Sequence, residues 1–474
     1  MQTPIADFVT EYANKNGSRF HMPGHKGQAF LGCEAFDITE IAGADALYEA
    51  EGIIAESEQN ATELFGTART VYSTEGSSQC IRAMMHLVVG YWKSRQAAGN
   101  EQGREDVGDR RDDKKQSVCM RPYIIAARNV HKAFLYAAAL VDFDVVWLYP
   151  EEMHSLCSCK ISAEQVEVEL KKQLEERGMA PAAVYVTSPD YLGGQLNIAA
   201  LAKVCRRYDT LLAVDNAHGA YLHFLENAQH PMDLGADICC DSAHKTLPVL
   251  TGGAYLHISK TAPAYFAENA KQAMVLFGST SPSYLIMTSL DLCNAYLADG
   301  YREKSASTIG KVENLKADFV EAGWEIENTD PLKITIATSG YTTGTKLAEH
   351  LREAGIECEY ADEEFVVLMV TPENIEEDYL NLRQALENFN SEKSWNAKKS
   401  QFRPVYCEQK LSIREAIFAE QEMVKAEDAL GRICGVPTVG CPPAIPIVVP
   451  GEVINEDALR LFQHYDVETV AVIK

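Results

Sequence analysis

The sequence predicts an α/β protein built on a mainly parallel sheet, followed by a small α+β domain and a C-terminal domain. Up to residue 290, short apolar runs alternate with helix-like segments. Most of these runs lack polar alternation, as expected for strands that crossover helices bury on both faces. The chain has 474 residues, which at about 150 residues per domain corresponds to about three domains.

Apolar, β-branched runs mark the strands expected in a seven-stranded large sheet. They are residues 70–74, 123–126, 145–148, 182–187, 211–215, 238–241 and 254–258. Helices are expected at 77–90 and 131–140, where apolar residues recur at helical spacing, and from the N-cap Ser162 to Gly178. Residues 94–117 are dense in charge and glycine, which predicts a solvated insertion between a helix and the next strand.

The region after residue 300 is shorter and less apolar. Strands are expected at 333–337 and 365–370, and helices at 346–354 and 375–389. The polar stretch 391–400 is expected to be a linker. An amphipathic helix at 412–430 and a proline-rich segment at 435–451 follow it.

Composition excludes several classes of protein. The 68 acidic residues outnumber the 43 Lys and Arg, for a net charge of -25, which argues against nucleic-acid binding. No apolar run approaches the length of about 18 residues that a membrane helix needs, and the N-terminus does not resemble a signal peptide. The 13 cysteines are scattered through apolar runs, which predicts free thiols in the cytoplasm.

Three features that follow successive strands indicate a common chemistry. Asp215 ends one expected strand, Lys245 follows the next, and Ser77 and Ser78 lie at a strand-to-helix turn that suits a phosphate. A phosphate site, a strand-end carboxylate and a lysine are what pyridoxal phosphate (PLP) requires. Each alone has an ordinary explanation, such as a helix cap or a surface lysine. Walker, G-x-G-x-x-G and G-x-S-x-G motifs are missing from the sequence.

The chain resembles the Orn/Lys/Arg decarboxylases, which are PLP-dependent enzymes of fold type I. The segments that carry the resemblance include 20–27 (FHMPGHKG), 129–132 (NVHK), 214–219 (VDNAHG), 242–248 (SAHKTLP) and 441–446 (CPPAIP). Residues 37–45, 65–70, 187–189, 279–285, 431–433 and 450–452 match as well, in family order. The chain looks like the short form of the family, without an N-terminal wing domain.

The resemblance implies decarboxylation of arginine, lysine or ornithine to the amine and CO2, through a Schiff base on Lys245 and a quinonoid intermediate. It also implies polyamine biosynthesis and a homodimer, or a dimer-based oligomer, with shared active sites. The domains it implies are an arm at 1–45, a PLP-binding domain at 46–295, a small domain at 296–393 and a C-terminal domain at 394–474.

The family's residue roles carry over as follows. Asp215 would pair with the pyridine nitrogen, His131 would stack on the ring, Ala217 would lie under the opposite face and His218 near the phenolic oxygen. His244 would neighbour the Schiff base. The phosphate would be bound by Ser77, Ser78 and Ser242, with Ser279 and Thr280 reaching over from a second subunit.

A carboxylate must also bind the distal cation of the substrate, and Glu49, Asp190 and Glu452 are the candidates, with His25 near the active site. No metal site is expected, because Pro23 and Gly24 forbid a helical pair of His21 and His25. The chain departs from the family at Asn216, where Glu is common, around residues 46–50, and in the insertion at 94–117. Because of these changes, the sequence does not decide which basic amino acid is the substrate.

Three other functions remain open at this point. The same cofactor and fold could support an aminotransferase or an aldolase. A non-catalytic relative could regulate an active homologue, although the retention of Lys245, Asp215 and His131 argues against it. A binding protein for a cationic metabolite would show affinity without turnover.

Overall fold

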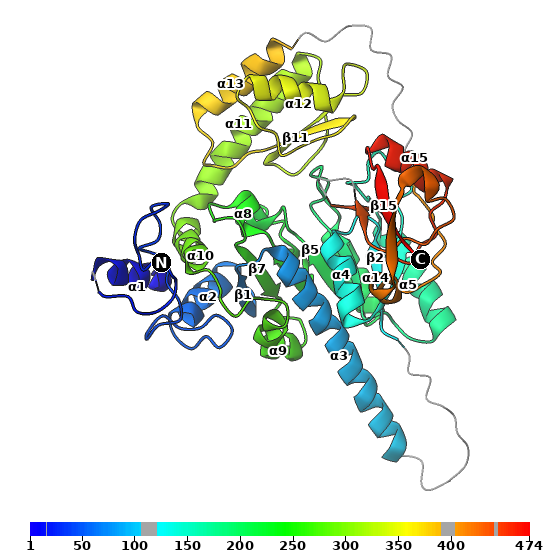
Figure 1. Ribbon diagram of the computed structural model, residues 1–474, viewed down its shortest axis with the longest axis horizontal. Helices are drawn as coiled ribbons and strands as arrows, with labels where there is room; N and C mark the ends of the chain where they lie inside the picture. The colour runs from blue at the N-terminus through cyan, green and yellow to red at the C-terminus, as the bar shows by residue number, and fades with distance from the viewer. Residues whose placement is uncertain (16, 106–120, 390–402, 440–443) are drawn as a thin grey trace.

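A computed structural model of the chain describes residues 1–15, 17–105, 121–389, 403–439 and 444–474 (Figure 1). The large sheet has seven strands in the order β1-β7-β6-β5-β4-β2-β3. They are β1 (Arg69–Ser73), β2 (Tyr123–Ala127), β3 (Asp144–Leu148), β4 (Ala183–Thr187), β5 (Leu211–Asp215), β6 (Ile238–Asp241) and β7 (Ala254–Ile258). Strands β2 to β6 pair in parallel with one another, whereas β7 is antiparallel to β1 and β6. The prediction of a mainly parallel seven-stranded sheet is confirmed.

Helices cover both faces of this sheet, which explains why its strands are apolar throughout. In β5, Ala213 faces the core that α3, α4 and α9 complete, while Leu212 and Val214 face the core of α5 and α6. The helices of this part are α1 (Pro4–Asn14), α2 (Ile53–Leu64), α3 (Ser77–Glu105), α4 (Lys132–Val141), α5 (Ala163–Arg177), α6 (Ile198–Arg207), α7 (Pro231–Leu234), α8 (Ala243–Thr246), α9 (Ala264–Val275) and α10 (Tyr284–Ala298), with the 3-10 helix η1 (Ala220–Phe224).

The prediction of a solvated insertion at 94–117 is wrong for the first part of that range. Helix α3 continues to Glu105, and it projects from the body of the protein in Figure 1. Residues 93–98 are exposed, so this stretch of helix needs no apolar stripe and the sequence shows no periodicity there. Residues 106–117 of the expected insertion lie outside the described residues.

A second, four-stranded antiparallel sheet follows, in the order β10-β11-β9-β8. Its elements are α11 (Tyr301–Glu321), β8 (Glu325–Ile326), β9 (Lys333–Ala337), α12 (Gly344–Glu353), β10 (Tyr360–Ala361), β11 (Phe365–Met369) and α13 (Glu376–Glu387). The two longer strands and both later helices match the sequence predictions. Strands β8 and β10 were not predicted, because two residues are too few for a periodic pattern.

The C-terminal part lies beside the end of the large sheet that holds β2 and β3 (Figure 1). It contains α14 (Ile413–Phe418), β12 (Gln421–Lys425), the 3-10 helix η2 (Ala426–Asp428), β13 (Thr438–Val439), β14 (Pro446–Val448), α15 (Glu456–His464) and β15 (Thr469–Ile473). The single helix expected at 412–430 is wrong, because β12 pairs antiparallel with β15, a partner distant in sequence. Met423 of β12 is 64% exposed, so this stretch does not bury a continuous apolar helix face.

Other expectations bear on the whole chain. The described cysteines are all free thiols. None of the helices in the described ranges is long and apolar enough to cross a membrane. The linker expected at 391–400 and residues 441–443 of the proline-rich motif fall outside the described residues. The domain boundaries expected at residues 45, 295 and 393 stay predictions.

Candidate active site

A cavity of about 350 Å³ lies where the parallel strands of the large sheet end. Asn129 follows β2, Thr187 and Asp215 end β4 and β5, and Ser242 follows β6. Because parallel strands present their carboxyl ends at one edge, side chains far apart in sequence meet there. The remaining walls come from α3, the turn that holds Lys245, and the segments around Tyr191, Glu359 and Ile445.

One corner of the cavity suits a phosphate. Ser77 and Ser78 begin α3, where the first backbone N–H groups have no partner within the helix and the helix dipole is positive. Ser242 donates a hydrogen bond from its Oγ to Oγ of Ser77 at 2.7 Å. Gly76 supports the turn with a φ of 74°. Three hydroxyls therefore lie with free backbone donors at one end of the cavity.

Asp215 supplies a buried carboxylate to the same cavity. Its Oδ1 accepts a hydrogen bond from the backbone N–H of Ala217 at 3.2 Å, and its Oδ2 accepts one from Tyr185 at 3.3 Å. Burial raises the pKa of Asp215, and the charge of Lys245 only partly opposes this. Among the described residues, no cation lies within ion-pair distance of it. A cationic group in the cavity would stabilise this carboxylate.

The side chain of Lys245 is linked through His218 to a second lysine, Lys333. Its Nζ atom is 2.9 Å from Nε2 of His218, and Nδ1 of His218 is 3.4 Å from Nζ of Lys333. Lys333 is 1% exposed and pairs with Asp330 at 3.5 Å. Burial, reinforced by the charges of the two lysines, lowers the pKa of His218 well below its usual value, and burial also lowers the pKa of Lys245.

Two more histidines line the cavity as neutral rings. His131 caps α4, accepting the backbone N–H of Ala133 on Nδ1 at 3.2 Å. Burial lowers the pKa of His131 to about 4. His244 donates from Nδ1 to the carbonyl of Gly253 at 3.0 Å, which leaves its Nε2 as an acceptor, and burial lowers its pKa too.

The cavity also holds polar atoms that need a partner. The Oδ1 of Asn129 and the Oγ1 of Thr187 are buried and have no hydrogen-bond partner within the described part of the chain. Buried polar groups are rarely left unsatisfied, so these atoms indicate a bound molecule. A phosphate corner, a carboxylate in need of a cation and an adjacent lysine fit PLP, and the small side chain of Ala217 leaves room for its ring.

The structure brings most of the expected cofactor residues together. The residues that line this cavity are Ser77, Ser78, His131, Asp215, Ala217, His218, Ser242, His244 and Lys245. Ser279 and Thr280 are exposed and lie outside the cavity of their own chain. Their expected reach into a second subunit stays a prediction.

The four residues expected to bind substrate do not line this cavity. His25 pairs with Asp37 at 3.1 Å, and Glu49 is exposed elsewhere. Asp190 is buried, and it accepts the backbone N–H of Gly194 at 2.8 Å. None of these three residues therefore lines the cavity of its own chain.

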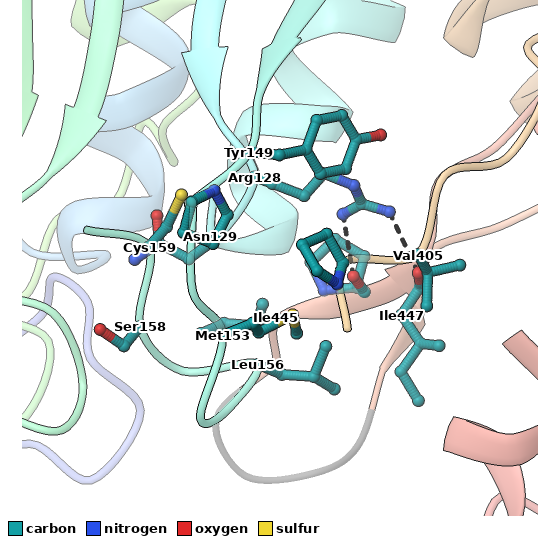
Figure 2. A pocket seen from close by; sticks show the side chains of 13 residues that line it. Arg128, Asn129, Tyr149, Met153, Leu156, Ser158, Cys159, Val405, Ile445 and Ile447 are labelled. Carbon is teal, nitrogen blue, oxygen red and sulfur yellow. Dashed lines mark hydrogen bonds between the residues drawn. The ribbon is translucent and has the colours of Figure 1, made fainter. Parts of the chain in front are cut away.

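Glu452, the fourth, lies beside Arg128, whose hydrogen bonds to two backbone carbonyls Figure 2 shows. Arg128 donates to the carbonyls of Pro446 at 2.9 Å and Ile447 at 3.1 Å. Its guanidinium also lies 3.4 Å from Glu452. Glu452 is 1% exposed and also accepts the backbone N–H of Val449. It neutralises Arg128 and fastens the C-terminal segment, so it is not free to bind a substrate.

A buried cluster behind the cavity holds three side chains of the metal-binding type. Asp241 accepts from Nε2 of His230 at 2.9 Å and of His257 at 3.1 Å. Its other oxygen accepts from Nδ2 of Asn216 at 2.7 Å. Burial would raise the pKa of Asp241, but the two histidines lower it below its usual value. These hydrogen bonds hold the residues directly after Asp215 and directly before Ser242.

Sequence reasoning missed several residues of the site. Tyr191, Glu359 and Ile445 line the cavity, and Lys333 contacts His218. Asn129 and Thr187 could have been found, because both follow or end expected strands within the matched segments. Glu359 and Lys333 come from the second sheet and carry no local signal. Taken together, the sheet, the lysine, the strand-end aspartate and the phosphate corner define a PLP-dependent enzyme of fold type I.

Comparison with known proteins identifies the family. Residues 3–91 and 115–338 match the major domain of the Orn/Lys/Arg decarboxylases, and residues 395–468 match their C-terminal domain. The chain belongs to the Orn/Lys/Arg decarboxylase family, and it is a PLP-dependent decarboxylase of basic amino acids.

Curated relatives and a solved structure agree with this assignment. The chain is 30% identical to an arginine decarboxylase of Halalkalibacterium halodurans, over 97% of this chain and 92% of the relative. It is 27% identical to an arginine decarboxylase of Bacillus subtilis, over 98% and 94% of the two chains. A lysine decarboxylase of Francisella novicida shares the fold, with a TM-score of 0.79, 17% identity and coverage of 100% of this chain and 81% of the other.

Proposed function

We propose that the chain converts L-arginine to its amine and CO2, with lysine and ornithine as the substrates to compare. The observation that carries the reaction is the cavity that joins Lys245, Asp215 and the phosphate corner. The choice of arginine is supported by the names of relatives that align over nearly the whole chain. The amine product is a precursor for polyamine biosynthesis, and free thiols support a cytoplasmic location.

The residues of the cavity divide between the parts of the cofactor. Ser77, Ser78 and Ser242 would bind the phosphate, Asp215 the ring nitrogen, and His131 and Ala217 the two faces of the ring. Lys245 would hold the cofactor covalently. When bound, PLP supplies an electron sink for the negative charge left on the α-carbon after CO2 departs.

The protein's own groups control the protons. Asp215 would hold a proton on the ring nitrogen, which would strengthen the sink, and the N–H of Ala217 holds its carboxylate in place. Lys245 would return a proton to the α-carbon from its ammonium form, and Nε2 of His244 would do so only after it had itself taken up a proton. The apolar side chain of Ile445 in the cavity wall would favour loss of the carboxylate charge.

A homodimer with shared sites is part of this proposal. Phe20 is 95% exposed, Leu31 is 89% exposed and Phe30 is 79% exposed, all within the expected N-terminal arm. Contiguous exposed apolar surface is typical of an interaction surface, and Phe30 and Leu31 are adjacent in the sequence. Sedimentation of the purified protein tests this: a monomer at all concentrations contradicts the dimer.

The experiment that tests the reaction is an assay of the PLP-loaded protein with arginine, lysine, ornithine and the uncharged analogue norleucine. CO2 release and identification of the amine are measured for each. The expected result is CO2 and amine from a basic amino acid. Keto-acid formation without CO2 would indicate an aminotransferase, and a protein that acquires no visible absorbance with PLP would indicate a non-catalytic relative.

A further inference from the structure

The cavity contains one carboxylate that the cofactor does not need. Among the described residues that line it, Asp215 and Glu359 are the acidic ones. Asp215 is 2% exposed and faces the position of the ring nitrogen. Glu359 precedes β10 of the second sheet, and its side chain is exposed at the cavity, where an entering molecule can reach it.

Tyr191 holds this carboxylate in place. Its hydroxyl donates to Oε1 of Glu359 at 2.7 Å. Its ring is packed edge-on against His218, with centroids 5.0 Å apart, and against Tyr360, with centroids 5.4 Å apart. Because the Tyr191 ring is packed against two other rings, it loses little conformational freedom when a ligand binds. Its hydroxyl therefore holds the Glu359 carboxylate in a fixed position.

The same tyrosine also reaches the reacting amine. The Nζ atom of Lys245 lies 5.7 Å from the centroid of the Tyr191 ring. One tyrosine side chain thus separates Lys245 from Glu359. Ornithine, lysine and arginine each end an unbranched side chain in a cation, so a substrate joined at the position of Lys245 can extend its distal cation toward Glu359.

We propose that Glu359, positioned by Tyr191, binds the distal cation of the substrate and selects basic amino acids. This inference rests on the proposed function and names the residue that the sequence candidates did not supply. The carboxylate, whose Oε1 accepts the bond of Tyr191, offers charge-assisted hydrogen bonds to an ammonium or guanidinium group. The face of the Tyr191 ring adds a cation–π contact along the side chain.

A purely structural role is the competing explanation for this pair. The bond between Tyr191 and Glu359 joins a loop of the large domain to the second sheet, and it could serve only to fasten the two. That role predicts lower stability in a variant, without any effect on the choice of substrate. Selection of the cation predicts a higher KM for charged substrates alone.

The test uses the PLP-loaded protein and the variant Glu359→Gln, which keeps the shape and removes the charge. We expect KM for the preferred basic amino acid to rise at least tenfold, kcat to change by less than about threefold, and KM for norleucine to stay the same. The visible absorbance of the cofactor should be unchanged. Glu357→Gln is the matched control, because Glu357 is exposed nearby and pairs with Arg352 at 3.1 Å.

Two further variants make the result decisive. Glu359→Asp keeps the charge but withdraws it by one methylene, and we expect a KM between those of the parent and Glu359→Gln. Tyr191→Phe removes the hydroxyl that orients Glu359, and we expect a smaller rise in KM. These variants also provide the answer if Glu359→Gln does not fold.

The outcomes separate this inference from the proposed function. If the parent releases CO2 from a basic amino acid while Glu359→Gln and Glu359→Asp keep the parental KM, only the role of Glu359 is overturned. An equal rise in KM for norleucine would assign the pair a structural role and overturn the proposal as well. If the parent decarboxylates no basic amino acid, the proposed function itself fails, and this inference fails with it.

Discussion

Lys333 lies against His218, with its Nζ atom 3.4 Å from the ring Nδ1. Lys333 also pairs with Asp330 at 3.5 Å, and a lysine ammonium can only donate. A neutral histidine that accepts on Nδ1 carries its proton on Nε2, the nitrogen that faces Lys245 at 2.9 Å. The arrangement is satisfied when Lys245 is a neutral amine, which is the form that attacks a carbonyl carbon.

We expect Lys333→Met to move the attachment of PLP to higher pH. Burial lowers the pKa of Lys245, and the positive charge of Lys333 lowers it further. Removing that charge raises the pKa of Lys245, so a higher pH is needed to deprotonate it. The rate at which visible absorbance appears after PLP is added to the cofactor-free protein, measured across pH, reports this shift.

Lys316→Met is the control for that measurement. Lys316 is also partly buried, but it donates to Thr329 at 3.0 Å and does not contact His218. Lys333→Arg, which keeps the charge, should restore much of the parental profile. An identical pH profile for Lys333→Met and the parent would contradict the role of Lys333.

Lys245→Ala should abolish both the visible absorbance of bound PLP and the release of CO2. The amine is the group proposed to hold the cofactor, and no other lysine lines the cavity within the described residues. Spectra and CO2 assays of the purified variant check this. Decarboxylation at the parental rate would overturn the whole assignment of the site.

Asp215→Ala should bind PLP in part and lose activity by a factor on the order of 100 or more. Without the buried carboxylate, the ring nitrogen is no longer held protonated, and the electron sink is weaker. The hydroxyls and backbone donors of the phosphate corner are left intact. Cofactor titration and kcat are measured together, and a parental kcat would show that Asp215 does not face the ring nitrogen.

Arg128→Met should lower the free energy of unfolding by about 3 kcal/mol or more, because Glu452 would be left as a buried, unpaired charge. Two carbonyls of the C-terminal segment would lose their donor as well (Figure 2). Arg460→Met is the control, since Arg460 is exposed and pairs only at the surface. Urea unfolding compares the three proteins, and equal stabilities would show that the Arg128 contacts are dispensable.

Asp241→Asn should destabilise the protein at neutral pH and do so less as the solution becomes acidic. The pKa of Asp241 is below its usual value in the folded protein, so its charge stabilises the fold above the unfolded pKa of about 3.9. That contribution disappears as pH falls from about 4 through the lower folded pKa. Unfolding of parent and variant at several pH values tests this, and a difference that grows in acid would contradict it.

Much of the fold and half of the site could be predicted because their signals are local. The seven strands of the large sheet are apolar runs whose length and flanking residues are visible in the sequence alone. Asp215, Ser77 and Lys245 follow such strands, and parallel strands bring their ends to one edge. Position along the chain was therefore enough to place these residues in one cavity.

The sequence by itself determined the sheet, the cofactor and the family of this protein. Only the tertiary structure decided which carboxylates are free. Glu452 pairs with Arg128, and Asp190 accepts a hydrogen bond within a nearby turn. Glu359, which precedes a strand of the second sheet, lines the cavity instead. Such pairings depend on how the two sheets and the C-terminal part pack against one another. A contact between distant segments produces no periodic pattern in the sequence around either residue, so the sequence does not predict it.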